Sequence, residues 1–182
     1  TKCSFAKHSA LRVTDLPMQL FTATGDLQQS SIIVSDSSVA STMTFGAGLS
    51  LRDSSALLLR NVTAGSLMLN ALVVNESSVV EFDQMRVKTS GVQISHSQFD
   101  GTTMRFLNST LVSTSTADNG NAIYFLNSVF KNGAQFILED TLVHATWTNT
   151  DAIRLATTYN ATRVEKYVYN YYYSLFESGA IF

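Results

Sequence analysis

Residues 102–111, TTMRFLNSTL, and residues 121–130, NAIYFLNSVF, share one pattern. Two apolar residues alternate with other residues, an Asn-Ser pair follows, and a third apolar residue comes three positions after the Asn. Alternation of this kind is typical of a short β-strand with one buried face. Asn tolerates a left-handed backbone conformation and bonds to nearby backbone groups, so it indicates a turn directly after the strand. Each unit therefore predicts a strand that ends at a corner.

The pattern recurs along most of the chain, which makes it an internal repeat. With Asp or Asn at the corner and Ser or Thr after it, residues 32–39, 49–56 and 136–143 also fit, and with a relaxed corner so do residues 57–64, 67–74, 80–87 and 92–99. Alternate corners fall at positions 36, 61, 84, 108 and 140, and the intervening corners fall at 53, 71, 96, 127 and 157. Both series lengthen around the polar stretch 113–121, which we interpret as one inserted loop.

Two short strands per turn of about 24 residues predict a parallel β-solenoid in which each coil hydrogen-bonds to the next. We expect about five coils. The alternation places Met104 and Phe106 inward and Arg105 outward, and likewise Phe125 inward and Tyr124 outward. The stacked inward residues would form one continuous core.

A ladder of polar side chains is expected at the corners, because their hydrogen-bonding groups can meet those of the coil above. The predicted corner ladder comprises Asp36, Asp53, Asn61, His96, Asn108, Asn127 and Asp140.

An antiparallel sandwich is the alternative fold, since it also contains short alternating strands. Its hairpins would require regular Asn-Gly or Asp-Gly turns. The chain has only Asn119-Gly120, Asn132-Gly133 and Asp100-Gly101. The parallel solenoid therefore fits the sequence better.

Composition limits the function classes. The chain is 45% hydrophobic, which indicates a folded protein, and only 14% charged, against about 25% in typical soluble domains. Its net charge is −2 and it has no cluster of Lys and Arg, so nucleic acid is not an expected partner. No apolar run is long enough for a membrane-spanning helix. Cys3 is the single cysteine, so an internal disulfide is excluded.

The sequence divides into three regions. Residues 1–27 predict an atypical N-terminal coil or cap, and residues 28–160 contain the repeats. Residues 161–182 are rich in Tyr and predict a C-terminal cap or tail, because tyrosine can cover the open end of a solenoid core.

The repeat units, especially residues 90–99, SGVQISHSQF, with the two units quoted above, resemble the coils of pectin-lyase-like right-handed β-helices. In their low charge and richness in Ser and Thr they are similar to the dispersed gene family surface proteins of trypanosomatids. The resemblance implies a right-handed parallel β-helix. It also implies a choice of activities, since enzymes on this fold cleave acidic polysaccharides with converging aspartates or with calcium and an arginine base.

The chain does not offer such a catalytic set. Its corner aspartates already have a structural explanation, and Glu81, Asp83 and Arg105, although expected on adjacent coils, read more simply as solvated surface. The three histidines are dispersed, and the loop residues Asp118, Asn119 and Asn121 are too weak a pattern for calcium. We predict no catalytic residue, no metal site and no cofactor.

Four Asn-X-Ser/Thr triplets are possible N-glycosylation sites. Asn75 and Asn160 are the expected acceptors, because Asn61 and Asn108 occupy corner positions.

The expected function is a structural or adhesive β-helix segment of a large extracellular or cell-surface protein, without enzymatic activity. Its partners would be host or matrix glycans or proteins. Two alternatives stay open: a polysaccharide-binding or polysaccharide-cleaving protein on the same fold, and a trimeric viral fibre section.

Overall fold

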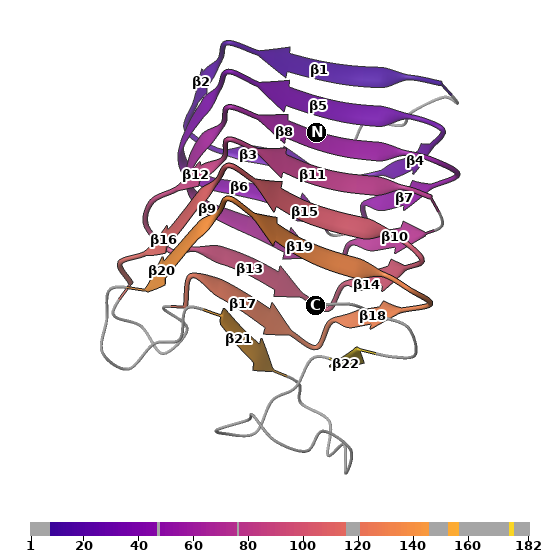
Figure 1. The fold of residues 1–182 in the computed structure, drawn as a ribbon. Helices are drawn as coiled ribbons and strands as arrows, with labels where there is room; N and C mark the ends of the chain where they lie inside the picture. Colours follow the sequence, from indigo (N-terminus) through magenta and orange to yellow (C-terminus); the bar gives the residue numbers. More distant parts are fainter. Residues whose placement is uncertain are drawn as a thin grey trace.

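The computed structural model describes residues 8–46, 48–75, 77–115, 121–145, 153–156 and 175–176. These residues contain no helix, and their strands pair in parallel within three sheets, which we call A, B and C. The chain passes through A, B and C in turn and then begins the next coil (Figure 1). The parallel β-helix predicted from the repeat is confirmed, and the antiparallel sandwich is excluded.

Sheet A is the most regular of the three. Its strands all have five residues and stack in the order of the chain (Figure 1). They are β1 (Ala10–Thr14), β5 (Ser31–Ser35), β8 (Ala56–Arg60), β11 (Val79–Asp83), β15 (Thr103–Leu107) and β19 (Gln135–Glu139).

Sheet C consists of very short strands. They are β4 (Asp26–Gln28), β7 (Ser50–Arg52), β10 (Val73–Asn75), β14 (Gln98–Asp100), β18 (Val129–Lys131) and β22 (Leu175–Phe176).

Sheet B is bent, and most coils cross it as two strands. The strands before the bend are β2 (Pro17–Met18), β12 (Arg86–Val87), β16 (Thr110–Ser113) and β20 (Leu142–Ala145). Those after it are β3 (Phe21–Ala23), β13 (Val92–Ser95), β17 (Ile123–Leu126) and β21 (Ile153–Ala156). Two long strands, β6 (Ser38–Gly46) and β9 (Thr63–Asn70), run through the bend.

Coil lengths match the repeat read from the sequence. Register pairs within sheet A are offset by 21, 25, 23, 24 and 32 residues along the chain, as in Ala10↔Ser31 and Thr103↔Gln135. The longest coil contains residues 114–122 between β16 and β17, where an inserted loop was expected. The first strands, β1 to β4, already belong to the three sheets, so residues 10–28 form a coil of the stack.

The prediction of two strands per coil was wrong, since each coil has three sides. The missing side is sheet C, where β4, β7, β10, β14 and β18 have three residues each and only the central one is a buried apolar residue, too few for the strand itself to show an alternating pattern. The five full matches to the repeat in fact fall on all three sheets: residues 32–39, 104–111 and 136–143 begin on sheet A, residues 49–56 on sheet C and residues 123–130 on sheet B.

A continuous core fills the space between the sheets. Met104, Phe106 and Phe125 are fully buried, as the alternation predicted. Equivalent rings stack from coil to coil: Phe82 and Phe106 have centroids 4.5 Å apart, and Phe99 and Phe130 have centroids 4.4 Å apart. Stacks of this kind stabilise the fold beyond the burial of their apolar area. Tyr124 alternates with the inward residues as expected but is only 5% exposed.

Candidate functional site

Three rows of corner residues run along the β-helix, and all of them have left-handed backbone conformations. Corner 1 leads from sheet A to sheet B, corner 2 from B to C, and corner 3 from C to A. Their φ angles lie between +48° and +57°. Corner 1 holds Asp15, Asp36, Asn61, Gln84, Asn108 and Asp140; corner 2 holds Ala71, His96 and Asn127; and corner 3 holds Gln29, Asp53, Ser77, Gly101 and Asn132.

All seven residues of the predicted ladder lie at corners. They form three rows, whereas the sequence indicated two series of corners. Asp53 belongs to corner 3 and was wrongly grouped with the corner 2 residues His96 and Asn127. Side chains bond between neighbouring coils: Asn61 Nδ2 donates to Asp36 Oδ1 at 2.9 Å, and Asn127 Nδ2 lies 3.2 Å from His96 Nε2.

Where a Ser or Thr follows a corner residue, its hydroxyl has a separate purpose, which the sequence did not reveal. The Met85 N–H donates to Ser109 Oγ at 3.0 Å, and Ser109 Oγ donates to the Leu107 carbonyl at 2.7 Å. One coil further, the Ser109 N–H donates to Thr141 Oγ1 at 3.3 Å. A hydroxyl of one coil thus accepts a backbone N–H of the coil before it. The donor is the residue directly after the corner residue, whose N–H does not take part in the regular pairing of the strands.

The same hydroxyl relay operates at the other two corners. At corner 2 the Leu72 N–H donates to Ser97 Oγ, and at corner 3 the Ser30 N–H donates to Ser55 Oγ. Because an unpaired buried N–H is costly, these hydroxyls account for much of the buried Ser and Thr.

Several outward carboxylates link neighbouring coils or strands. Glu81 on β11 pairs with Arg105 on β15 at 3.0 Å and with Arg60 on β8 at 3.8 Å. Asp83 Oδ1 accepts Asn108 Nδ2 at 3.2 Å. Glu81, Asp83 and Arg105, which were considered above as a catalytic set, therefore lie on adjacent strands of sheet A. Their contacts there link one coil to the next.

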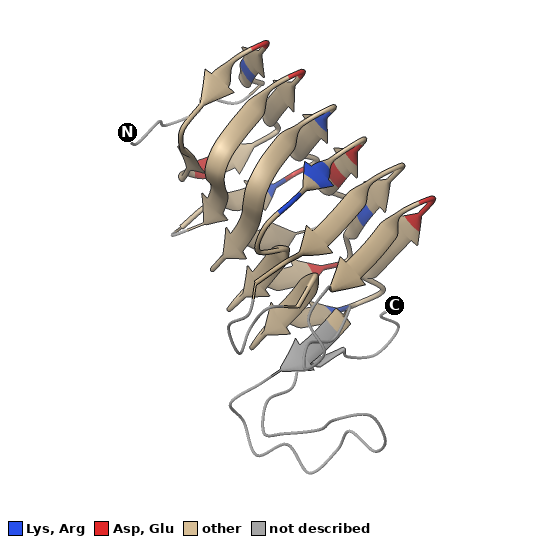
Figure 2. Ribbon diagram, turned by 90° about the vertical axis from the view of Figure 1, so that its left-hand side faces the viewer, with Lys and Arg blue, Asp and Glu red and all other residues tan. Residues whose placement is uncertain are grey.

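Asp100 is the clearest electrostatic case. Its Oδ1 accepts Asn132 Nδ2 at 2.7 Å, and its Oδ2 lies 3.3 Å from the Lys131 ammonium. The hydrogen bond from Asn132, with the charge and hydrogen bond of Lys131, holds the pKa of the Asp100 carboxyl below its usual value against the opposing effect of desolvation. Figure 2 shows that charged positions are few and that acidic ones gather where strands turn.

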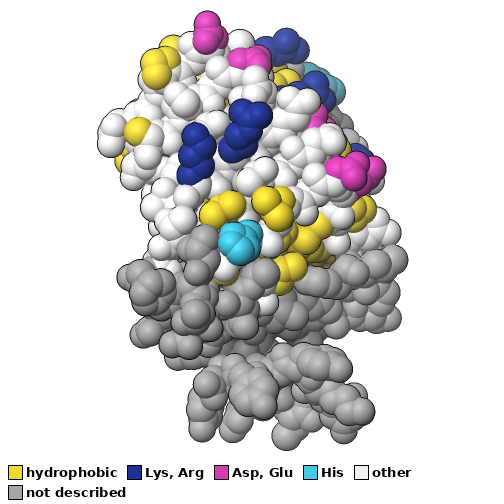
Figure 3. All heavy atoms as spheres, turned by 60° about the vertical axis from the view of Figure 1, so that its left-hand side comes forward, with side chains coloured by type: hydrophobic (Ala, Val, Ile, Leu, Met, Phe, Trp, Pro, Cys, Tyr) yellow, Lys and Arg dark blue, Asp and Glu magenta, His cyan; other side chains and the backbone are white. Residues whose placement is uncertain are grey.

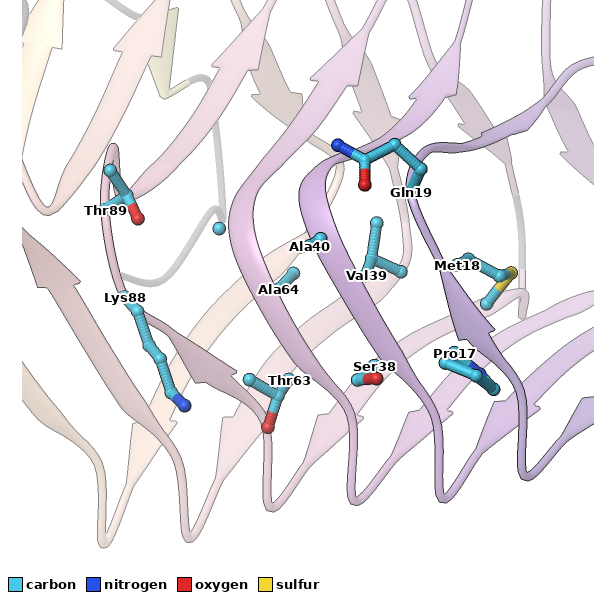
Figure 4. Close-up of a pocket in the computed structure, with 11 residues that line it drawn as sticks. Pro17, Met18, Gln19, Ser38, Val39, Ala40, Thr63, Ala64, Lys88 and Thr89 are labelled. Atoms are coloured by element: carbon cyan, nitrogen blue, oxygen red, sulfur yellow. The ribbon is translucent and has the colours of Figure 1, made fainter.

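A groove of about 500 Å³ lies on the outer face of sheet B, on the side where β2, β6, β9 and β12 stack (Figure 4). It forms at a β-bulge: the register between β6 and β9 shifts between Val39 and Thr42, so that Ala40 and Ser41 lie opposite the single residue Gly65. A Cβ on Gly65 would lie 2.6 Å from the Ser41 carbonyl oxygen. Glycine therefore permits the close approach that shapes this bend.

Polar side chains and one cation line the groove. Pro17, Ser38 and Thr63 form a row on successive strands, and Lys88 lies at the opposite side from Met18 (Figure 4). The hydroxyls of Ser38, Thr63 and Thr89 and the amide of Gln19 complete the polar lining. This concave, hydroxyl-rich surface is our candidate binding site.

The other predicted features have varied outcomes. Asn61 and Asn108 are exposed but hydrogen-bonded through Nδ2, whereas Asn75 is only half-exposed. Asn160, Cys3, Asp118, Asn119 and all of 161–182 except Leu175 and Phe176 lie outside the described residues.

Across the described ranges, no three His, Cys, Asp or Glu residues lie close enough to hold a metal ion. The same ranges include no helix with the length and apolar character of a membrane span. No protein-family model, no curated protein and no solved structure matches this chain.

Proposed function

We propose that this chain is a non-catalytic structural and adhesive β-helix segment of a large extracellular or cell-surface protein. The observation that carries the proposal is the use of outward carboxylates as links between coils. Asp36, Glu81 and Asp83 each contact a side chain of a neighbouring coil. A carboxylate held by such contacts serves the rigidity of the stack.

Rigidity is also supported by the continuous core and by the hydroxyl relay at all three corners. A stack in which each coil satisfies the next behaves as a stiff rod whose length follows the number of coils. The outer faces then remain available for contact with other molecules. The resemblance to pectin-lyase-like β-helices and to trypanosomatid surface proteins belongs to this proposal, as does glycosylation at Asn61, Asn75, Asn108 or Asn160.

The proposal is tested by incubating the purified chain with pectate, alginate and sulfated glycosaminoglycans, with and without calcium. Neither unsaturated uronates, detected by ultraviolet absorbance, nor new reducing ends should form. Release of either product would overturn the non-catalytic assignment. In parallel, beads coated with the chain should adhere to matrix glycans or proteins, and beads that adhere to nothing would overturn the adhesive part.

A polysaccharide-binding protein is the second candidate, and the groove on sheet B favours it. Its lining of hydroxyl and amide groups can both donate to and accept from sugar hydroxyls. Binding to a glycan array without turnover would support this candidate, and binding with turnover would support the enzymatic alternative.

A further inference from the structure

We infer that the groove on sheet B is a binding site for an anionic oligosaccharide, with Arg86 and Lys88 as the residues that receive its sulfate or carboxylate groups. The inference rests on the proposed adhesive function and names the ligand class and the place where it binds. Three independent features of the groove lead to it.

The first feature is the pairing of cations. Among the described residues, Arg52, Arg60, Arg105 and Lys131 each form an ion pair on sheet A or sheet C. Arg86 and Lys88 on sheet B are exposed and form none with any described residue, as is also true of Arg12 on sheet A. Lys88 lines the groove, and Arg86 pairs in register with the lining residue Thr63. Arg86 and Lys88 flank the inward residue Val87, so both side chains leave the same face about 6.6 Å apart.

The second feature is the lack of negative charge on this face. No Asp or Glu occurs in the described segments that make up sheet B and its bend, which are residues 17–23, 38–46, 63–70, 86–95, 110–115, 121–126, 142–145 and 153–156. Figure 3 shows two basic side chains together on this side of the molecule, with the acidic side chains at its margins. The residues that line the groove therefore carry one positive and no negative charge, although the whole chain carries −2, and the acidic residues Asp15 and Asp36 lie at corner 1, two positions before Pro17 and Ser38.

The third feature is a set of unused polar groups. Many buried Ser and Thr hydroxyls serve the corner relay, but the side chains of Gln19, Ser38, Thr63 and Thr89 form no hydrogen bond within the described part of the chain. They line the groove together with Lys88, and Gln19 lies on the side of the groove away from it (Figure 4). Such groups can exchange hydrogen bonds with a polyhydroxylated ligand.

An acidic peptide fits this groove less well. Extended peptides usually bind by adding a strand to a free sheet edge. The backbone along the groove is already paired, because β6 bonds to β2 on one side and to β9 on the other, and β9 bonds to β12. Recognition therefore falls to side-chain hydroxyls, amides and cations, which is the chemistry of an anionic sugar chain. Four strands spaced about 4.8 Å apart give room for a short oligosaccharide.

The test is titration of the full chain with four probes: a heparin oligosaccharide, an oligogalacturonate, a neutral dextran oligosaccharide and poly-glutamate. At least one anionic oligosaccharide should bind, and dextran and poly-glutamate should bind at least tenfold more weakly. Whichever anionic probe binds more tightly identifies the preferred oxyanion. Equal affinity for poly-glutamate, or no binding of either anionic sugar, would overturn the inference.

Two variants locate the site. Arg86→Ala with Lys88→Ala should weaken binding by about a hundredfold, since two charge-assisted hydrogen bonds are lost. The control, Arg12→Ala with Arg52→Ala, removes the same charge from exposed residues of sheets A and C and should change affinity by less than about twofold. Equal losses in both pairs would overturn the assignment to the groove.

Ala40→Glu adds a carboxylate at an exposed position in the groove and should also abolish binding. Unchanged circular dichroism and thermal midpoint show that each variant is folded. Cleavage of a bound probe would overturn the non-catalytic function and leave the groove assignment intact. Adhesion of the chain without binding of anionic sugars would overturn the groove assignment and leave the adhesive function intact.

Discussion

Sheets A and B belong to the same coils but differ in almost every respect. The strands of sheet A all have five residues and stack without interruption. Those of sheet B range from two to nine residues and are broken at the bend, by residues 19–20, by residues 88–91 and by residues 114–122. The described charges on the outer face of sheet A include the Arg60–Glu81–Arg105 network, whereas Arg86 and Lys88 on sheet B have no ion-pair partner among described residues.

The difference shows how a repeat can combine order with variation. Sheet A and corner 1 hold neighbouring coils in register, so a coil can accept extra residues on a side other than sheet A. Sheet B accepts them, and its bulge leaves a groove. We expect substitutions on the sheet A side to change stability and substitutions on the outer face of sheet B to change binding.

The largest effect is expected at the core beneath sheet A. Phe106→Ala removes a fully buried ring that stacks on Phe82 and also contacts Phe136, so it should lower the free energy of unfolding by about 3–5 kcal/mol. Val112→Ala, on the outer face of β16, should lower it by less than about 1 kcal/mol. Denaturant unfolding of both variants measures the contrast, and similar losses would remove the distinction between the two sides.

The next effect concerns the hydroxyl relay. Ser109→Ala leaves the Met85 N–H without its acceptor in a buried position, so the loss should be about 1–3 kcal/mol. The neighbouring Thr110→Ala, an outward position of β16, should lose about 0.5 kcal/mol. The two midpoints in urea give the comparison, and hydrogen exchange should show faster exchange of the Met85 amide only in the Ser109 variant. If Ser109→Ala left the free energy of unfolding unchanged, the hydroxyl relay would be contradicted.

A smaller effect is expected from corner geometry. Asn108 has a φ of 49°, so Asn108→Val should lose about 1–2 kcal/mol, and Asn108→Gly should stay closer to the original protein. Thr114→Val, at an exposed position on the sheet B side, should change stability by less than about 0.5 kcal/mol. Thermal unfolding ranks the three. If valine is tolerated as well as glycine at position 108, backbone conformation does not determine the choice of residue there.

The smallest effect is pH-dependent and lies on sheet C. The pKa of Asp100 is lowered in the folded chain, so its carboxylate stabilises the fold above the unfolded pKa near 4, and this stabilisation disappears as pH falls through the lower folded value. The stability difference between the original protein and Asp100→Asn should therefore shrink below about pH 4. Denaturant titrations at a series of pH values measure it. A difference that stays constant to the lowest pH would show that the Asn132 and Lys131 contacts contribute nothing.

The sequence predicted the fold well because its signal is local. Alternation in residues 104–107 and a corner residue at Asn108 are enough to indicate a strand and its end, and the repeat then implies parallel stacking. Sheet C was not recognised as a separate side because its three-residue strands, such as β14 with Phe99, offer one buried apolar residue each. Asp53 was consequently assigned to the wrong row.

The groove could not be predicted in the same way. Ala40, Thr63 and Lys88 are distant in sequence and come together only through the register of β6, β9 and β12. The bulge at Ala40 and Ser41 has no distinct sequence signature. One hint was present: Arg86 and Lys88 alternate around an apolar residue in a chain with few charges, although without a fold their partners could not be judged.

The hydroxyl relay has a consequence for how such a chain changes over generations. At corner 1 the acceptor comes from the next coil only where that coil has Ser or Thr after its corner residue, as at Ser109 and Thr141, whereas Val62 and Met85 offer no hydroxyl. A duplicated or deleted whole coil therefore keeps the register of sheet A, and it keeps the relay wherever the coil brought into contact carries that hydroxyl, whereas a gain or loss of a few residues within sheet A would misalign every corner beyond it. Length should evolve in steps of entire coils.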